Sequence, residues 1–234
     1  MLDDLWNLFE NRLFPMPSTE TLFNQYKDED PRVDLPNAHE IRRGNLMNYL
    51  RSFPERPNIL VVGEAAGPWG ARFSGIPFTG EKQLCEHTMP FLGRRSSVEK
   101  PLLETKKEPP YTSQSAEIFW RVMKPRHPRF FVWDCVPFHP HPSNKILRIR
   151  NPTKKEISDF SELLKEIIEL LNIKPGRIAA VGRKAECALK EIEVKEPIHY
   201  VRHPSRGGAK EFERGIEKLF RDEMNVRTSN SDKG

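Results

Sequence analysis

Residues 58–81 read Asn58-Ile-Leu-Val-Val-Gly-Glu-Ala-Ala-Gly-Pro-Trp-Gly-Ala-Arg-Phe-Ser-Gly-Ile-Pro-Phe-Thr-Gly-Glu81, an apolar run that changes abruptly into glycine, proline and a lone acid. The run from Ile59 to Val62 predicts a buried parallel strand, because four aliphatic residues in a row leave no polar face for solvent. Gly63 is expected to end that strand. The later glycines allow a backbone to approach a ligand closely. Since open α/β sheets bind ligands at the carboxyl ends of their strands, this loop is predicted to belong to a binding site.

The glycine spacing excludes two common phosphate-binding motifs. Gly63, Gly67 and Gly70 do not fit the G-x-G-x-x-G spacing of dinucleotide-binding proteins, and no Gly-Lys-Ser/Thr follows to make a phosphate loop. A bound cofactor is therefore not expected.

Three further apolar runs predict the remaining strands of one sheet. They cover residues 130–136, 177–182 and 198–201, and segments with helical spacing of apolar residues lie between them. This alternation predicts an α/β fold, a three-layer αβα sandwich around a four-stranded parallel sheet. We expect residues 1–224 to form a single domain and the polar residues 225–234 to form a disordered tail.

Helices are expected over residues 2–14, 39–53, 81–91, 116–123, 157–171, 183–192 and around 212–220. Thr153 and Glu156 match a capping box at the start of the fifth of these. Arg42 and Arg43 are predicted to be solvated charges on an outer helix face. Residues 93–115 are rich in Lys, Glu, Pro and Ser, which predicts a long mobile loop.

The composition limits the classes of protein to which the chain can belong. The chain has 234 residues and a net charge of +5, which favours a polyanion partner only weakly because acids are also plentiful. Cys85, Cys135 and Cys187 are odd in number and widely spaced, which argues against disulfides and a Cys-x-x-Cys metal site and fits a reduced cytoplasm. The sequence shows no run of membrane-spanning length and no signal pattern. We expect a cytoplasmic monomer.

Three motifs resemble those of the uracil-DNA glycosylase superfamily, in the same order. Residues 63–67, Gly-Glu-Ala-Ala-Gly, resemble the G-E-A-P-G of its thermostable iron–sulfur members, and residues 67–78 are similar to the single-strand-selective monofunctional class. Residues 131–139 and 201–208 match the two later motifs. The resemblance covers residues 40–222 and implies a glycosylase-like fold, DNA as partner and a nucleotide flipped out of the duplex. The four cysteines that hold an iron–sulfur cluster in relatives are not all present, so no cluster is expected.

The resemblance assigns two residues around the flipped base. Phe78 occupies the stacking position, although a core phenylalanine is the alternative. His203 matches the histidine that donates a hydrogen bond to the 2-oxygen of the leaving pyrimidine. Ser205, Arg206 and Gly207 belong to the loop that wedges into the duplex in this family, although a glycine pair also makes a bare turn.

The group that activates water is harder to assign. Many relatives carry Asp or Asn at the position of Ala65, and an alanine cannot polarise water. Glu64 is the remaining acid on the loop and is predicted to orient water or stabilise the sugar cation. The alternative is that Glu64 only braces the loop by accepting backbone hydrogen bonds. Ala65 also keeps open a non-catalytic module that binds DNA or senses damage.

Asp134 stands where uracil-cleaving relatives have Asn. An ionised Asp offers acceptors only, which suits the exocyclic amine of cytosine but leaves the ring nitrogen in need of a shared proton or a water. Gly67 replaces the tyrosine that blocks 5-substituents in the most selective uracil enzymes. Together these residues predict a 5-substituted cytosine as the excised base, as in bulky modified phage DNA, and hence a role in anti-phage defence. The alternative is uracil repair with a protonated or water-bridged Asp134.

Two remaining sequence features each have an ordinary structural explanation as the alternative to a functional one. Lys145, Arg148 and Arg150 lie in a basic stretch that is predicted to track phosphates, although an ordinary basic loop fits equally. His139 and His141 form a His-x-His pair without nearby acids or cysteines, so no metal site is expected. The motifs contain no lysine poised for Schiff-base chemistry, which predicts a monofunctional enzyme that leaves an abasic site.

Overall fold

The computed structural model describes residues 1–194 and 197–231, including side chains up to Arg221. Its centre is a four-stranded parallel sheet in the order β3-β2-β5-β6, and β1 pairs with β4 in a separate antiparallel ribbon. The strands are β1 (Leu22–Phe23), β2 (Ile59–Ala65), β3 (Phe130–Val136), β4 (His139–Pro140), β5 (Ile178–Val181) and β6 (Ile198–Val201). The predicted α/β fold with four parallel strands is confirmed.

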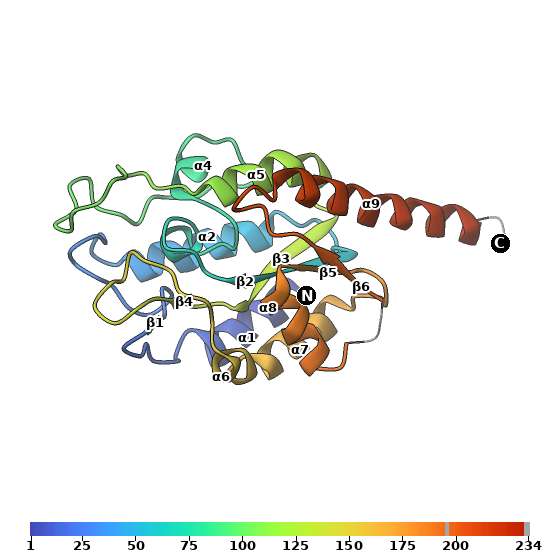
Figure 1. Ribbon diagram of the computed structural model, residues 1–234, viewed down its shortest axis with the longest axis horizontal. Coiled ribbons are helices and arrows are strands. Elements are labelled where there is room, and N and C mark those ends of the chain that lie inside the picture. Colours follow the sequence, from blue (N-terminus) through green and yellow to red (C-terminus); the bar gives the residue numbers. More distant parts are fainter. Residues whose placement is uncertain (195–196, 232–234) are drawn as a thin grey trace.

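Helices cover both faces of this sheet (Figure 1). In this view α4, α5 and α9 lie above the sheet, and α1, α6, α7 and α8 lie below it. The helices are α1 (Leu2–Leu8), the π-helical η1 (Phe9–Leu13), α2 (Ala38–Arg51), α3 (Ala71–Ser74), α4 (Glu81–Cys85), α5 (Gln114–Met123), the 3₁₀-helical η2 (Lys124–Arg126), α6 (Lys154–Asp159), α7 (Ser161–Leu171), α8 (Arg183–Glu191) and α9 (Ala209–Ser231). The capping box of Thr153 and Glu156 begins α6 as predicted.

Several boundaries differ from the sequence prediction, and the helix expected over residues 81–91 ends at Cys85. Strand β2 continues through Gly63 to Ala65, because Gly63 pairs in register with Asp134 of β3. The helix expected over residues 157–171 is divided at Phe160, whose backbone leaves the helical range at φ −105° and ψ 4°.

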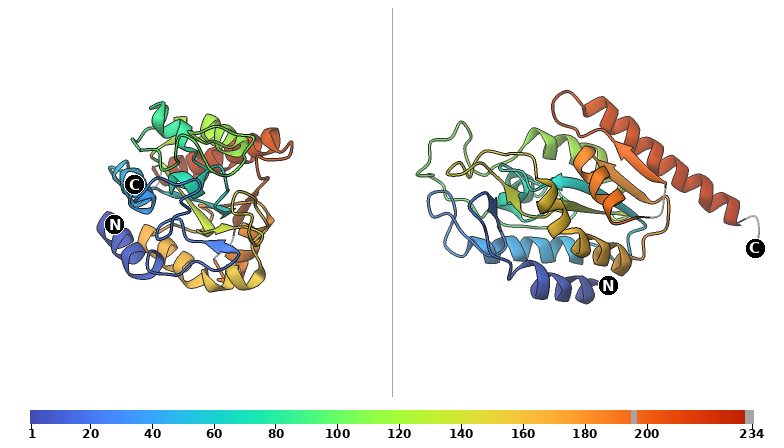
Figure 2. Two further views of the ribbon diagram at one scale, coloured as in Figure 1. Left: turned by 90° about the vertical axis from the view of Figure 1, so that its left-hand side faces the viewer. Right: turned by 60° about the horizontal axis from the view of Figure 1, so that its bottom comes forward.

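Helix α9 extends beyond the body of the molecule (Figures 1 and 2). It continues to Ser231, so residues 225–231 are helical and the prediction of a disordered tail is wrong for them. Once a helix is nucleated, each added residue gains a backbone hydrogen bond, so polar residues can extend a helix that is packed further upstream. Residues 232–234 of the expected tail lie outside the described residues.

Arg42 corrects the prediction of a solvated charge. Its side chain is fully buried and forms an ion pair with Asp34, which also accepts a hydrogen bond from Nη2 of Arg72 at 2.9 Å. Burial alone would raise the pKa of Asp34, but the charges of Arg72 and Arg42 lower it. Arg43 is half-buried and donates to the Tyr26 carbonyl oxygen at 2.6 Å. A helical periodicity does not reveal partners that are distant in sequence.

Replacing Asp34 with alanine should lower the free energy of unfolding by about 3–5 kcal/mol, because it leaves two arginines buried without their countercharge. Chemical denaturation measures this loss. Asp159→Ala is the matched control, since Asp159 pairs with Lys155 on the surface and such exposed pairs contribute about 0–1 kcal/mol. Similar losses in the two variants would contradict the prediction.

Residues 93–113 form most of the loop predicted over residues 93–115, whose last two residues begin α5, but the loop is anchored. The buried carboxylate of Glu81 accepts hydrogen bonds from the backbone N–H of Ser97 at 2.9 Å and of Tyr111 at 3.2 Å, and from the Ser97 hydroxyl at 2.7 Å. The expectation of a mobile loop is therefore wrong at these points, because a buried carboxylate fastens them to the start of α4.

Candidate active site

Residues from distant parts of the chain line one pocket of about 440 Å³. Strands β2, β3 and β6 deliver them at their carboxyl ends, as expected for a parallel sheet. Nine predicted site residues line this pocket, namely Glu64, Ala65, Gly67, Phe78, Asp134, Arg150, His203, Ser205 and Arg206. Gly207, Lys145 and Arg148 are not among the lining residues. The structure therefore brings together the candidate base-binding and catalytic groups.

Gly63 allows the two sides of the pocket to meet. A Cβ atom at this position would lie 2.2 Å from Oδ1 of Asp134 and 2.5 Å from Cε2 of Phe78. Both distances are far below van der Waals contact, so no other residue fits here without moving these side chains. Position 63 therefore requires glycine because Asp134 and Phe78 approach the β2 backbone closely there, and not because a strand ends there.

Asp134 carries its carboxyl group into a buried part of the pocket. The residue is 3% exposed, and within the described chain the carboxyl has no hydrogen-bond partner. Burial, and secondarily the charge of Glu64, raises the pKa of Asp134 to about 8. The carboxyl is therefore mainly protonated near pH 7 and presents one donor and one acceptor. Of the two states considered from the sequence, an ionised and a protonated Asp134, the burial of the carboxyl favours the protonated one.

Phe78 lies beside this carboxyl with its backbone at a φ of 52°. Phe119 of α5 stacks on the ring, with centroids 4.5 Å apart and planes inclined by 14°. The His203 ring lies 5.5 Å away, centroid to centroid. Phe78 is only partly buried and lines the pocket, so it is not simply a core residue. A rigid apolar surface therefore faces the space next to Asp134.

His203 is neutral and has a defined tautomer. Burial, followed by the charges of Arg202 and Arg206, lowers the pKa of His203 to about 4. The backbone N–H of Ser205 donates to Nδ1 at 3.2 Å, and the Ser205 hydroxyl lies 2.8 Å from the same nitrogen. Since Nδ1 accepts, the proton of the neutral ring resides on Nε2. His203 thus offers an N–H donor.

Glu64 is held at the amino terminus of α8. Its Oε1 accepts a hydrogen bond from the backbone N–H of Lys184 at 3.0 Å. A Cβ atom on Gly182 would lie 2.4 Å from the same oxygen, so the glycine makes room for the carboxylate. The helix terminus stabilises negative charge there. This contact matches the bracing role considered as an alternative, although Glu64 also lines the pocket beside Ala65.

Arg150 differs from the expectation of a free phosphate contact. Its guanidinium donates to Glu156 Oε2 at 2.8 Å, to the Thr21 carbonyl at 2.9 Å and to the His141 carbonyl at 3.2 Å. These bonds fasten the loop before α6 to the β1 region. Lys145 and Arg148 are exposed on the same loop. The basic stretch is therefore divided into a structural arginine and two exposed charges.

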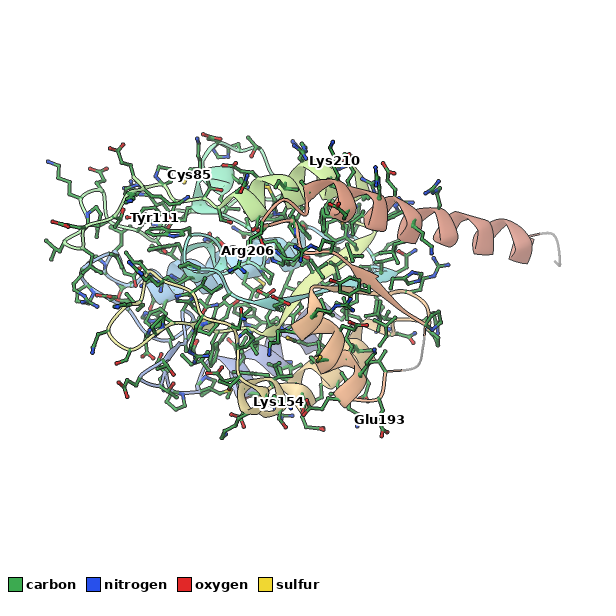
Figure 3. The ribbon with its side chains drawn as sticks, in the orientation of Figure 1. Cys85, Tyr111, Lys154, Glu193, Arg206 and Lys210 are labelled. Carbon is green, nitrogen blue, oxygen red and sulfur yellow. The ribbon has the colours of Figure 1, made fainter. Side chains whose placement is uncertain are left out.

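Arg206 and Gly207 form the turn that follows β6. Both have left-handed backbones, at φ values of 51° and 79°, and the Gly208 N–H donates to the Ser205 carbonyl at 3.0 Å. Arg206 is exposed on this turn between β6 and α9, and Lys154 lies far from it in the same view (Figure 3).

Sequence reasoning missed three residues at the pocket rim. Arg183, Tyr200 and Arg202 line the pocket, and the Arg183 guanidinium carbon lies 4.1 Å from the centre of the Tyr200 ring. Arg183 follows the end of β5, so the rule that ligands bind at strand ends was enough to indicate it. Arg202 lies within the motif of residues 201–208, and Tyr200 directly precedes that motif.

The His-x-His pair braces a loop. Nδ1 of His139 lies 2.8 Å from the Ala66 carbonyl oxygen and Nε2 lies 2.8 Å from that of Ile146. Burial is the main cause that lowers the pKa of His139 to about 3, so the ring is neutral and donates one hydrogen bond. Across the described chain, no three His, Cys, Asp or Glu side chains are grouped so that they could hold a metal ion.

No helix in the described part of the chain has the length and apolar character needed to cross a membrane. The search of curated proteins gives no match. The fold is similar to the crystal structure of wild-type SMUG2 from Pedobacter heparinus, with a TM-score of 0.61 and 16% identity over 97% of this chain and 98% of that chain. The family model described as "Uracil DNA glycosylase superfamily" matches residues 50–222. The chain therefore belongs to the uracil DNA glycosylase superfamily and is a DNA glycosylase.

Proposed function

We propose that this glycosylase excises a 5-substituted cytosine from DNA and leaves an abasic site. The observation that carries the proposal is the buried Asp134 carboxyl, which has no hydrogen-bond partner within the described chain and faces the pocket. Some viral genomes carry bulky modified cytosines, so the activity would serve anti-phage defence.

A neutral Asp134 pairs with cytosine through two hydrogen bonds. The carbonyl oxygen of the acid accepts from the exocyclic amine, and its O–H donates to the ring nitrogen. The raised pKa of Asp134 supplies the shared proton that this pairing needs. An ionised carboxylate would instead set two acceptors against each other at the ring nitrogen.

Space beside Gly67 supports a substituent at the 5-position. A Cβ atom built on Gly67 meets no atom within 4 Å. The cavity of about 440 Å³ lies in the size range of pockets that hold ligands larger than a single pyrimidine ring. The same space offers no contact that favours a bare cytosine.

The remaining groups suit cleavage of the glycosidic bond. The flipped base stacks on Phe78, and Nε2–H of His203 donates to the pyrimidine 2-oxygen, where negative charge develops as the bond to the sugar breaks. Water then adds to the sugar carbon and loses a proton, which neutralises the departing base anion, and Glu64 orients that water or stabilises the sugar cation. No lysine of the described chain lines the pocket, which supports a monofunctional reaction.

The enzyme would meet DNA as a monomer without an iron–sulfur cluster. Arg183, Arg202 and Arg206 line the pocket, and their positive charge suits the phosphates that would flank a flipped nucleotide.

Uracil is the second candidate, and the protonation of Asp134 favours it as well. The acid O–H can donate to the 4-oxygen of uracil while the acid carbonyl accepts from the ring N–H. Asp134 alone therefore admits cytosine without excluding uracil, and the choice depends on the surroundings of the 5-position.

A panel of oligonucleotides tests the proposal. Each carries one uracil, cytosine, 5-methylcytosine, 5-hydroxymethylcytosine or a bulkier 5-substituted cytosine, and abasic product is measured on gels after alkaline cleavage. We expect excision of a 5-substituted cytosine and none of unmodified cytosine. Gly67→Tyr should abolish excision of the substituted base by filling the open space. Excision of uracil alone by the unaltered enzyme would refute the proposal.

A further inference from the structure

Ile149 is an exposed apolar residue at the mouth of the pocket. Its side chain is 55% exposed and lines the pocket, and Arg148 and Arg150 flank it in the sequence. An isoleucine side chain exposed to water contributes no hydrophobic stabilisation here until a partner covers it. The bound partner at this mouth is DNA, and the exposed charge of Arg148 beside the residue complements a phosphate backbone.

The loop that carries Ile149 is held on both sides of it. The Ile146 carbonyl oxygen lies 2.8 Å from Nε2 of His139, and the Arg150 N–H donates to the Pro140 carbonyl at 3.2 Å. The Arg150 guanidinium adds the bonds to Glu156 and Thr21 described above. Ile149 is thus presented by an ordered loop, and little conformational entropy is lost when it binds.

The loop after His203 does not supply an apolar wedge. Its residues from Ser205 to Ala209 are Ser, Arg, Gly, Gly and Ala, and none has a large apolar side chain. A nucleotide that leaves the duplex opens a gap in the base stack, and proteins commonly insert an apolar side chain at such a step. The resemblance therefore assigned the wedge to a loop that has no large apolar side chain.

We propose that Ile149 is the residue that inserts into the gap left by the extruded nucleotide. This inference rests on the glycosylase activity and not on which base is excised. Ile149 is a positioning residue, because it holds the flipped state open and does not contact the reacting bond. Arg148 contacts the adjacent phosphate from the same loop.

Binding to a stable abasic-site analogue, tetrahydrofuran, tests the proposal without knowledge of the base. Ile149→Ala should weaken binding to a duplex with one tetrahydrofuran site by about tenfold, because the gap is no longer filled. Binding to a single strand with the same site should change by less than about twofold, since a single strand has no stacked gap to fill. Fluorescence anisotropy measures both affinities.

Two variants make the experiment specific. Ile149→Leu keeps a large apolar side chain and should retain tight duplex binding. Leu102→Ala is the matched surface control, because Leu102 is 80% exposed and is not among the residues lining the pocket. Equal losses on duplex and single strand, or no loss on the duplex, would overturn the assignment. Either result would leave the proposed base specificity untouched, because the analogue carries no base.

Discussion

Replacing His203 with alanine should slow base excision by about 10²–10³-fold, the usual loss when one donor to a developing oxyanion is removed. The reason is the fixed Nε2–H, which the contacts of Ser205 to Nδ1 hold in place. Single-turnover kinetics with saturating enzyme measure the chemical step. Thermal stability should change little, since His203 lies on a partly exposed loop at the end of β6.

His199→Ala provides the control for this variant. His199 lies in β6, the strand that precedes His203, its Nε2 is 3.1 Å from the Gly176 carbonyl oxygen, and it is not among the residues lining the pocket. The rate of base excision by His199→Ala should stay near that of the unaltered enzyme.

Because the pKa of His203 is lowered to about 4, titration of this ring should not alter the rate of base excision above about pH 5. A threefold loss or less in His203→Ala would show that the donor is not used.

Asp134→Asn should change the ratio of cytosine-type to uracil excision in favour of uracil. An amide keeps its donor and acceptor on fixed atoms, whereas the proton of a neutral acid can occupy either oxygen. In the unaltered enzyme, excision of the cytosine-type base should fall as the pH rises through about 8, where Asp134 ionises and loses its donor. Asp134→Asn should lack that fall. Identical base ratios and pH profiles in the two proteins would contradict the pairing.

Asp134→Asn should also change how the stability of the folded protein depends on pH. The pKa of Asp134 is raised to about 8 in the folded protein from 3.8, so the folded state retains a proton that the unfolded state loses. The unaltered protein therefore loses stability as the pH rises from about 4 to about 8. The melting temperature of Asp134→Asn should exceed that of the unaltered protein by more at about pH 8 than at about pH 5. A constant difference would contradict a protonated Asp134.

The sheet and most of the pocket were accessible from the sequence. Continuous apolar runs identify buried parallel strands, and ligands gather where such strands end, so Glu64, Asp134 and His203 were expected to meet. The parallel sheet confirms the predicted strands, and the three residues line one pocket.

The errors concern charges whose partners are distant in the sequence. Arg42 pairs with Asp34, and Arg150 is bonded to Thr21, which lies 129 residues away. Charge patterns along a helix or loop do not reveal such partners. The sequence left open whether Asp134 is ionised or protonated, because a pKa depends on burial and neighbours that only the folded chain provides.

The buried cluster of Asp34, Arg42 and Arg72 has a practical consequence for anyone who trims this chain. The family model begins at residue 50, whereas Asp34 and Arg42 come before it and Arg72 comes after it, in the helix that follows the Gly67 loop. A fragment that begins at residue 50 would leave Arg72 buried without Asp34, the acid that pairs with it. The shortest working form of this enzyme must therefore begin well upstream of the region by which its relatives are recognised.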